Sequence, residues 1–336
     1  MKDGLLEMGE DMRFHYILSY TPRNRTDDGR FREVSVEVRR RGLEVRTRHG
    51  YFAMPPTVLR PLPDPKAKAL AALELTPPPS HFPLFAAALS FPTDGPEGLV
   101  PVFLEVPGDR FELAVGSDGS LRGDVTFVAR IRDEEGRLFA RLGQRFRPNA
   151  PLPTGKDVQT GGLLCHPLVR LPAGRFVLEA AAYDAVADKT SVRVQPFRGP
   201  EKEAAARLSS LVVAKAIRRL DPLPEEEPDP LVFGDSLLQP NLGETVHKSE
   251  TPSLAFFVVA QGRERLPEEA VVEVWGDGTR VGRSAMKLEP PDPEGTVRQG
   301  GSVSLASLRP GLYTLKVEVA SGEGPARAEA SFSLAE

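Results

Sequence analysis

Hydrophobic and polar residues alternate with a period of two over short stretches of this chain. Near its start, residues 33–39 and 43–47 alternate in this way and are joined at a turn at residues 41–42. Such alternation is typical of strands with one buried face. Because residues 5–12 have helix-like apolar spacing and residues 14–20 are rich in aromatic and β-branched residues, the pattern predicts a helix end followed by three strands.

From about residue 82 to residue 197 the pattern becomes one of short strands separated by turns. The sequence Asp-Glu-Glu-Gly at residues 133–136 is a good hairpin turn between two of them. Strands of this length with turns at these intervals predict an antiparallel sandwich. The expected strands are residues 100–106, 125–131, 138–146, 176–183 and 191–197.

A second β-rich stretch runs from residue 231 to the end. It shares with the first the pattern L-x-x-L-x-x-G-x-aromatic-x-L, which begins at Leu168 and again at Leu305. In each copy glycine turns the chain, and the aromatic residue and leucine then share one face of the next strand. Any strand after a Pro/Gly turn can produce this pattern, but its place in both stretches favours two similar sandwiches. The strands expected in the second are residues 253–260, 271–275, 280–287, 312–319 and 328–334.

Two proline-rich segments separate these regions. In the first, Asp64 can cap a short helix that begins with Pro65, and the triple proline at residues 77–79 ends it, which predicts a semi-rigid spacer. In the second, residues 208–216 are an apolar run that suits a helix or a strand, with strand favoured. The predicted organisation is an α/β remnant (1–54), a connector (55–80), β-sandwich 1 (81–198), a Pro/acidic connector (199–230) and β-sandwich 2 (231–336).

The composition excludes several classes of protein. The chain has 336 residues, of which 40% are hydrophobic and 27% charged, and this is a globular balance. Its 43 basic and 47 acidic residues give a net charge of −4, which disfavours nucleic-acid binding. The 33 prolines and 30 glycines argue against an all-helical fold, and the single cysteine forbids an intrachain disulfide. No apolar run approaches the length of a transmembrane segment, and the first residues lack the pattern of a signal peptide.

Residue patterns that could carry catalysis or metal binding are weak. The five histidines are scattered singly, so metal ligation by them is not expected. Cys165 and His166 are adjacent, and adjacent side chains of an extended segment point to opposite faces, which is wrong for a nucleophile and its base. We therefore expect Cys165 to be a small buried residue. The glycine-containing segments 116–120 and 276–282 are predicted to be turns between strands rather than a nucleophile elbow or a phosphate loop.

Three further features have a structural interpretation and a functional one. Residues 122–124 form the tripeptide Arg-Gly-Asp, which some integrin ligands use, but here it lies at a turn before a strand. The arginine-rich stretch 23–48 is expected to be a solvated face, with an anion-binding patch as the alternative. Trp275 and Tyr313 could stack on a sugar, although core packing is favoured for both rings.

Three strings in the first 51 residues resemble the closing part of the von Willebrand factor A-related (VWFA) domain of acidobacterial proteins. They are Y-x-L-x-Y-x-P at residues 16–22, D-G-R-F-R at 28–32 and G-L-x-V-x-x-R-x-G-Y at 42–51. Residues 171–179 and 240–243 resemble the β-rich C-terminal regions of the same proteins. The resemblance implies a doubly wound α/β domain whose metal site opens with D-x-S-x-S. That motif is absent here, because residues 118–122 and 329–333 break the pattern.

These considerations lead to one expected function and one alternative. We expect a mainly β chain in which two immunoglobulin- or fibronectin-like antiparallel sandwiches follow a partial VWFA domain, as a fragment or descendant of a larger bacterial protein. The expected function is a non-catalytic spacer and protein-binding region of an exported protein, with an unidentified protein partner. We assign no catalytic, cofactor-binding or metal-binding residue. The alternative is a set of accessory or carbohydrate-binding modules of an exported hydrolase.

Overall fold

The computed structural model divides the chain into two compact units, Met1–Pro55 and Pro56–Glu336, which we describe separately. In the first unit, β1 (Phe31–Glu33) pairs antiparallel with β2 (Gly50–Phe52). The strand predicted over residues 33–39 is wrong in its extent, because the described pairing ends at Glu33 and residues 34–36 are irregular. The predicted helix end and the strands at 14–20 and 43–47 lie outside the described residues. The structure describes residues 31–36, 38, 50–52, 67–117, 119–151, 162–202, 204–219, 229–233, 235–262 and 266–336.

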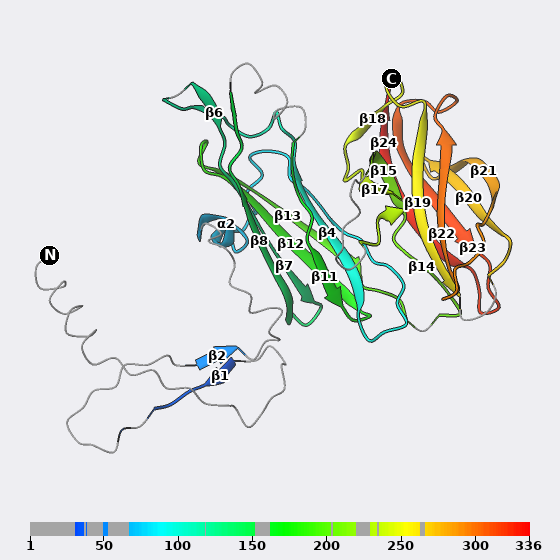
Figure 1. The fold of residues 1–336 in the computed structure, drawn as a ribbon, viewed down its shortest axis with the longest axis horizontal. Helices are drawn as coiled ribbons and strands as arrows, with labels where there is room; N and C mark the ends of the chain where they lie inside the picture. Colours follow the sequence, from blue (N-terminus) through cyan, green and yellow to red (C-terminus); the bar gives the residue numbers. More distant parts are fainter. Residues whose placement is uncertain are drawn as a thin grey trace, which may run out of the picture. The chain divides into compact units, whose positions relative to one another are not determined.

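The second unit is mainly β, as the sequence predicts, and its first half contains two antiparallel sheets that we call the first β unit (Figure 1). In one sheet β4 is flanked by β3 on one side and by β10 and β11 on the other, and the other sheet has the order β13-β12-β7-β8. A small third sheet has the order β5-β6-β9. The strands are β3 (Phe85–Ala88), β4 (Gly98–Val106), β5 (Ala114–Val115), β6 (Ser120–Arg122), β7 (Val125–Asp133), β8 (Leu138–Phe146), β9 (Asn149–Pro151), β10 (Leu163–Cys165), β11 (Leu168–Leu171), β12 (Arg175–Asp184) and β13 (Lys189–Arg198).

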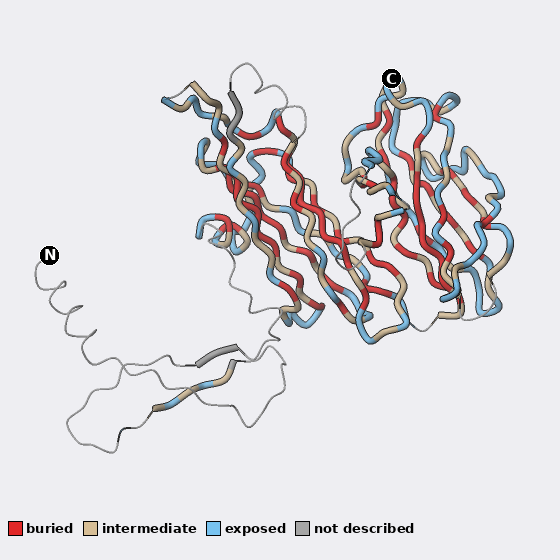
Figure 2. The backbone as a smooth tube through the Cα atoms, viewed as in Figure 1, coloured by how far each residue is buried: buried red, intermediate tan, exposed pale blue. Residues whose placement is uncertain are grey.

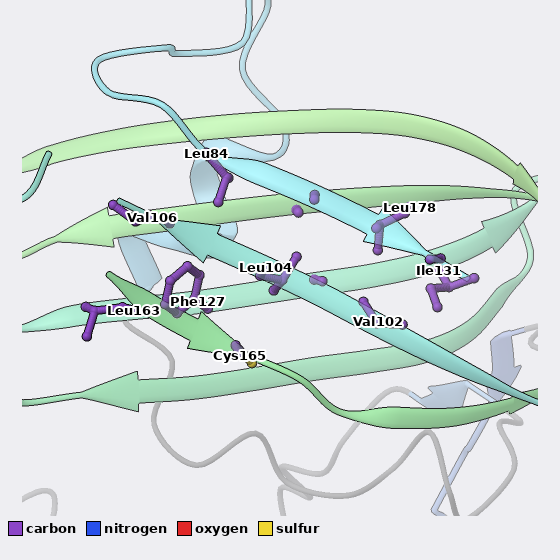
Figure 3. Packing of buried hydrophobic residues seen from close by; sticks show 14 of the residues in the cluster. Leu84, Val102, Leu104, Val106, Phe127, Ile131, Leu163, Cys165 and Leu178 are labelled. Carbon is purple, nitrogen blue, oxygen red and sulfur yellow. The ribbon is translucent and has the colours of Figure 1, made fainter. Parts of the chain in front are cut away.

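The core of the first β unit lies between its two larger sheets. Alternate residues of β4, such as Val102 and Leu104, point toward alternate residues of β7 and β12, such as Phe127, Ile131 and Leu178 (Figure 3). All five are almost fully buried. The alternation seen in the sequence therefore places one face of each strand in a shared apolar layer, which is the main stabilising term for such a fold.

The remaining strands form the second β unit, which also has two sheets. One has the order β18-β24-β23-β20-β21, and in the other β19 pairs with β14 and β15 on one side and with β22 on the other. Figure 2 shows buried residues along the central strand β19, whereas the edge strand β21 is mostly exposed. The strands are β14 (Ala206–Leu208), β15 (Val212–Arg219), β16 (Val232–Phe233), β17 (Ser236–Pro240), β18 (Thr245–His247), β19 (Ser253–Gly262), β20 (Glu269–Gly276), β21 (Thr279–Lys287), β22 (Thr296–Ser304), β23 (Gly311–Val319) and β24 (Ala326–Ala335).

The two β units share a strand order. In each, a hairpin (β7-β8 or β20-β21) lies beside a second hairpin (β12-β13 or β23-β24), and the inner strands of the two hairpins pair with each other. The repeated pattern L-x-x-L-x-x-G precedes the inner strand in both cases. Its first half differs, because Leu168 begins β11 whereas Leu305 lies in a turn after β22.

The two predicted connectors contain more structure than their composition indicates. In the first, Ala69 and Ala72 of α2 (Ala67–Ala72) are buried, and Ala69 packs onto the outer face of the β7-β12 sheet, where Val128 and Ala181 lie. The described part of this spacer is therefore docked rather than extended. Residues 64–65, predicted to begin the helix, lie outside the described residues. In the second connector β14 and β15 join the sheet of β19, which agrees with the preference for a strand there. Among the described residues, no helix is both long and apolar enough to span a membrane.

Candidate functional site: the junction of the two β units

The strands β4 and β19 are buried on both faces. In β4, Leu104 points into the core of the first β unit while its neighbour Phe103 points away from that core, and both are about 1% exposed. In β19, Phe256 points into the core of the second β unit and Phe257 away from it. A strand buried on both faces requires a covering layer on each side, so each outer face must meet another part of the protein.

The outer faces of β4 and β19 meet in a shared apolar cluster, which we call the junction. Phe103 and Phe257 lie in this cluster with Phe91 of the first β unit. The ring of Phe103 also stacks on His166, with 4.0 Å between the ring centroids. The junction contains Phe91, Phe103, Val212, Leu231, Leu238, Phe257 and Val259, all of them buried. The two β units are therefore held by apolar burial as well as by the chain that links them.

A buried arginine crosses the junction. The Arg207 side chain is 2% exposed, and its guanidinium donates hydrogen bonds to the Thr93 carbonyl at 2.8 Å and the Lys202 carbonyl at 3.1 Å. It also donates to one Asp94 carboxylate oxygen at 2.7 Å, and the Gln261 amide donates to the other at 2.6 Å. A buried charge is tolerated only when it is paired and hydrogen-bonded. Asp94 thus connects the first β unit to two side chains of the second.

A second charged contact crosses the junction at Lys215. Its ammonium group donates to Glu105 of β4 at 2.7 Å and to Glu244 at 2.6 Å. Burial raises the pKa of Glu105, and the nearby Lys215 only partly opposes this shift. Burial lowers the pKa of Lys215, but its hydrogen bonds to the two carboxylates outweigh burial and leave that pKa raised. The ammonium therefore stays charged and bridges the two β units.

Cys165 and His166 do not form a catalytic pair. Cys165 lies in the core of the first β unit at 2% exposure, and burial raises the pKa of its thiol to about 12. His166 lies at the junction, where its Nε2 is 3.4 Å from a carboxylate oxygen of Asp229. Burial lowers the pKa of His166, and the carboxylate partly opposes that shift. The prediction that Cys165 is a small buried residue is confirmed.

The turns predicted from glycine patterns are present. Residues 276–278 join β20 to β21, with Asp277 and Gly278 both at positive φ (50° and 72°), as a tight hairpin requires. The glycine pattern at 116–120 joins β5 to β6. In the Arg-Gly-Asp tripeptide, the Asp124 carboxylate accepts hydrogen bonds from Arg145 at 2.6 and 2.8 Å. This aspartate is therefore engaged within its own sheet.

The histidines that the structure describes do not form a metal site. Within the described residues, no group of three or more His, Cys, Asp or Glu side chains is placed to hold a metal ion. The other two described histidines lie apart, His81 at the Thr190 backbone and His247 in β18. His15, His49 and most of the arginine-rich stretch lie outside the described residues.

The two aromatic side chains considered for sugar stacking differ in exposure. Tyr313 is 8% exposed, stacks on Phe332 in the core of the second β unit and donates its hydroxyl to the Arg309 carbonyl. Trp275 is half-buried, donates its indole N–H to Glu273 and has the Lys316 ammonium 5.2 Å from its ring centroid. Core packing of Tyr313 is confirmed. The same prediction is wrong for Trp275, which lies among charged side chains on the outer face of its sheet.

A shallow hollow lies beside β22. Its volume is about 440 Å³, and it is lined by Phe233, Arg298 and Gly300 together with the carboxylate side chains of Glu289 and Asp292. The Phe233 ring is 44% exposed and packs edge-on against Phe257 of the junction. The hollow is thus an open extension of the junction rather than an enclosed cavity.

No motif in the sequence indicates that the junction residues lie together. The available signal was the length of the apolar runs at residues 99–104 and 254–260, which are not interrupted by polar residues. Such runs indicate strands covered on both faces. Arg207 and Lys215 had no signal of their own, because charged residues in a connector are expected to be solvated.

No family model matches this chain, and no curated protein matches it.

Proposed function

We propose that the chain is a non-catalytic spacer and protein-binding region of an exported VWFA-related protein. In this proposal its two β units are immunoglobulin- or fibronectin-like sandwiches. The observation that supports it best is the junction, in which Phe103, Phe257 and Arg207 hold two units of the same strand order. A spacer presents binding surfaces at a set separation and orientation, and buried contacts between units serve that purpose.

The charged contacts argue for a defined geometry as well as for cohesion. An apolar cluster alone tolerates sliding, because burial is not directional. The hydrogen bonds of Arg207 to Thr93 and Asp94 and those of Lys215 to Glu105 require particular distances and angles. They therefore select one arrangement of the two β units among those that would bury similar apolar area.

Spin labels on the two units test the spacer function. Val194 in β13 is 52% exposed and Leu312 in β23 is 63% exposed, so a cysteine at each position can carry a label. The native Cys165 is buried and leaves the labelling selective. We expect a narrow distribution of distances between the labels in Val194→Cys/Leu312→Cys, and a broader one when Phe257→Ala is added. A broad distribution without Phe257→Ala, or turnover of a panel of ester, peptide and glycoside substrates, contradicts the proposal.

A further inference from the structure

Each β unit has one sheet that does not contain its junction strand, β4 or β19, and one edge of that sheet is blocked. At the edge formed by β13, Pro196 has no N–H to donate, and Ser80 forms a bridge with Ser191. In the second β unit the corresponding strand, β24, is covered by β18. Unpaired strand edges invite association with other chains, and proteins commonly block them with proline or with a covering segment.

The opposite edges, β8 and β21, are open among the described residues. Each pairs with a single neighbour, β8 with β7 and β21 with β20. Both strands are nine residues long, and both carry basic residues and no acidic one. Their sequences are LFARLGQRF and TRVGRSAMK. The two β units therefore present open basic edges at equivalent positions.

The basic residues of β21 all have a carboxylate of the neighbouring strand β20 beside or opposite them. Arg280 and Arg283 lie 2.9 and 3.6 Å from the carboxylate of Glu273 on the neighbouring strand. Lys287 is opposite Glu269 in the strand register. A carboxylate from a partner would therefore compete with Glu273 and Glu269 at this edge.

The charges of β8 are only partly neutralised. Arg141 is exposed and lies opposite Arg130, whose guanidinium is already paired with Glu74 and Glu179. Within the described part of the chain, Arg141 has no acidic partner. Arg145 pairs with Asp124, so β8 combines one engaged arginine with one that is free to bind a carboxylate.

The other face of β8 is largely apolar, although the exposed Gln144 also lies on it, opposite the core residue Phe127. Leu142 and Phe146 are half-buried and pack against the core of the first β unit. Because side chains alternate along a strand, a segment paired with β8 would place every second residue beside Arg141 and the residues between beside Leu142 and Phe146. Acidic residues suit the first set of positions and apolar residues the second.

We propose that the edge of β8 binds an extended segment of a partner protein in which acidic and apolar residues alternate. The segment adds as a further strand to the sheet β13-β12-β7-β8, and Arg141 contacts its carboxylates. Backbone hydrogen bonds along an open edge supply affinity in this mode of recognition, and the alternate side chains supply specificity. The inference rests on the proposed protein-binding function and names the surface and the chemistry of the partner.

A pair of synthetic peptides tests the proposal on the full chain. One is a nine-residue peptide in which glutamate alternates with valine, and the other has lysine in place of glutamate. We expect fluorescence anisotropy to detect binding of the glutamate peptide only, with an affinity that falls as salt is added, because the attraction is between exposed charges. Amide hydrogen exchange should slow in β8 when this peptide binds.

Two charge reversals distinguish the edges. Arg141→Glu should weaken binding of the glutamate peptide at least about tenfold, whereas Arg283→Glu on β21 should leave it unchanged. Both side chains are exposed, so the thermal midpoint of each variant should match that of the parent chain. Matched midpoints show that any difference in binding arises at the edge.

Several results would overturn this assignment without touching the spacer function. They are equal binding of the lysine peptide, equal binding by Arg141→Glu, slowed exchange at β21 or β22 instead of β8, and self-association of the chain through β8. Conversely, a broad distribution of distances between the spin labels would contradict the spacer function. It would not affect the β8 proposal, which the peptide experiments test separately.

Discussion

Replacing Phe257 with alanine tests whether the two β units are packed together in solution. Phe257 is 1% exposed and lies at the junction, beside Phe233 and in the same cluster as Phe103. Burying a phenylalanine contributes about 1.5–3 kcal/mol, so Phe91, Phe103 and Phe257 together contribute about 5–9 kcal/mol. That sum is comparable with the ~5–15 kcal/mol net stability of a whole domain. We therefore expect the two units to unfold in one cooperative transition.

In Phe257→Ala the loss of the ring and the cavity it leaves should cost about 3–5 kcal/mol. We expect differential scanning calorimetry to show the single transition split into two, because the coupling across the junction is weakened. The adjacent residue provides a matched control. Phe256→Ala removes the same side chain from the core of the second β unit, where Phe256 is 4% exposed. It should destabilise that unit by a similar amount while leaving Phe257 and the junction in place.

The comparison has a clear negative outcome. If Phe257→Ala unfolds with the midpoint and the single transition of the parent chain, the junction contributes nothing and the outer faces of β4 and β19 are not packed on each other. If Phe256→Ala and Phe257→Ala produce the same split, the two faces of β19 do not have the separate roles described above.

Three further predictions concern buried polar groups. Arg207→Lys should destabilise the protein to urea by about 1–3 kcal/mol, because an ammonium cannot reproduce the guanidinium's bonds to two carbonyls and a carboxylate; Asp94→Asn, at a 69% exposed carboxylate, should cost less. The pKa of Glu105 is raised in the folded state, so its contribution to stability is present at low pH and is lost as pH rises through that pKa. Glu105→Gln should therefore compare more favourably with the parent chain at pH 7 than at pH 4 in urea titrations, and an equal difference at both pH values would refute this. The thiol of Cys165, whose pKa is raised from 9.0 to about 12, should hold about a thousandfold less thiolate than a free cysteine at neutral pH. A thiol reagent should label it only in denaturant, and rapid labelling of the native chain would contradict its burial.

The strands of eight or more residues, apart from β22, could be predicted from the sequence, because each carries its own signal, whereas the short strands could not. The hairpin at residues 133–136 and the positive φ of Asp277 and Gly278 follow from local turn chemistry. Chain geometry separates the side chains of Cys165 and His166, and the expected burial of Cys165 matches its place in the core. These features depend on neighbours in the chain, and local patterns report such neighbours well.

The strand β22 was missed because two glycines and several polar residues lie within it. Gly301 is needed there for a reason outside the strand, since a Cβ at this position would lie 2.4 Å from the ring of Phe256. The junction was missed for a similar reason. The hydrophobicity of Phe103 and Phe257 indicates that both are buried, but the identity of the layer that covers them is a property of the whole fold. Contacts between residues about 150 positions apart leave no periodic trace in a single sequence.

The burial of β4 and β19 on both faces limits how this protein can be dissected. A recombinant piece that begins at residue 231, just after the proline-rich acidic run, would lack β14 and β15 and leave one side of β19 unpaired. A piece that ends at residue 198 would expose Phe91 and Phe103 to water. Each piece would expose an apolar surface to water and would therefore tend to aggregate. Laboratories that express this protein should therefore keep residues 67–336 intact, and crystallisation or partner screens should use that span.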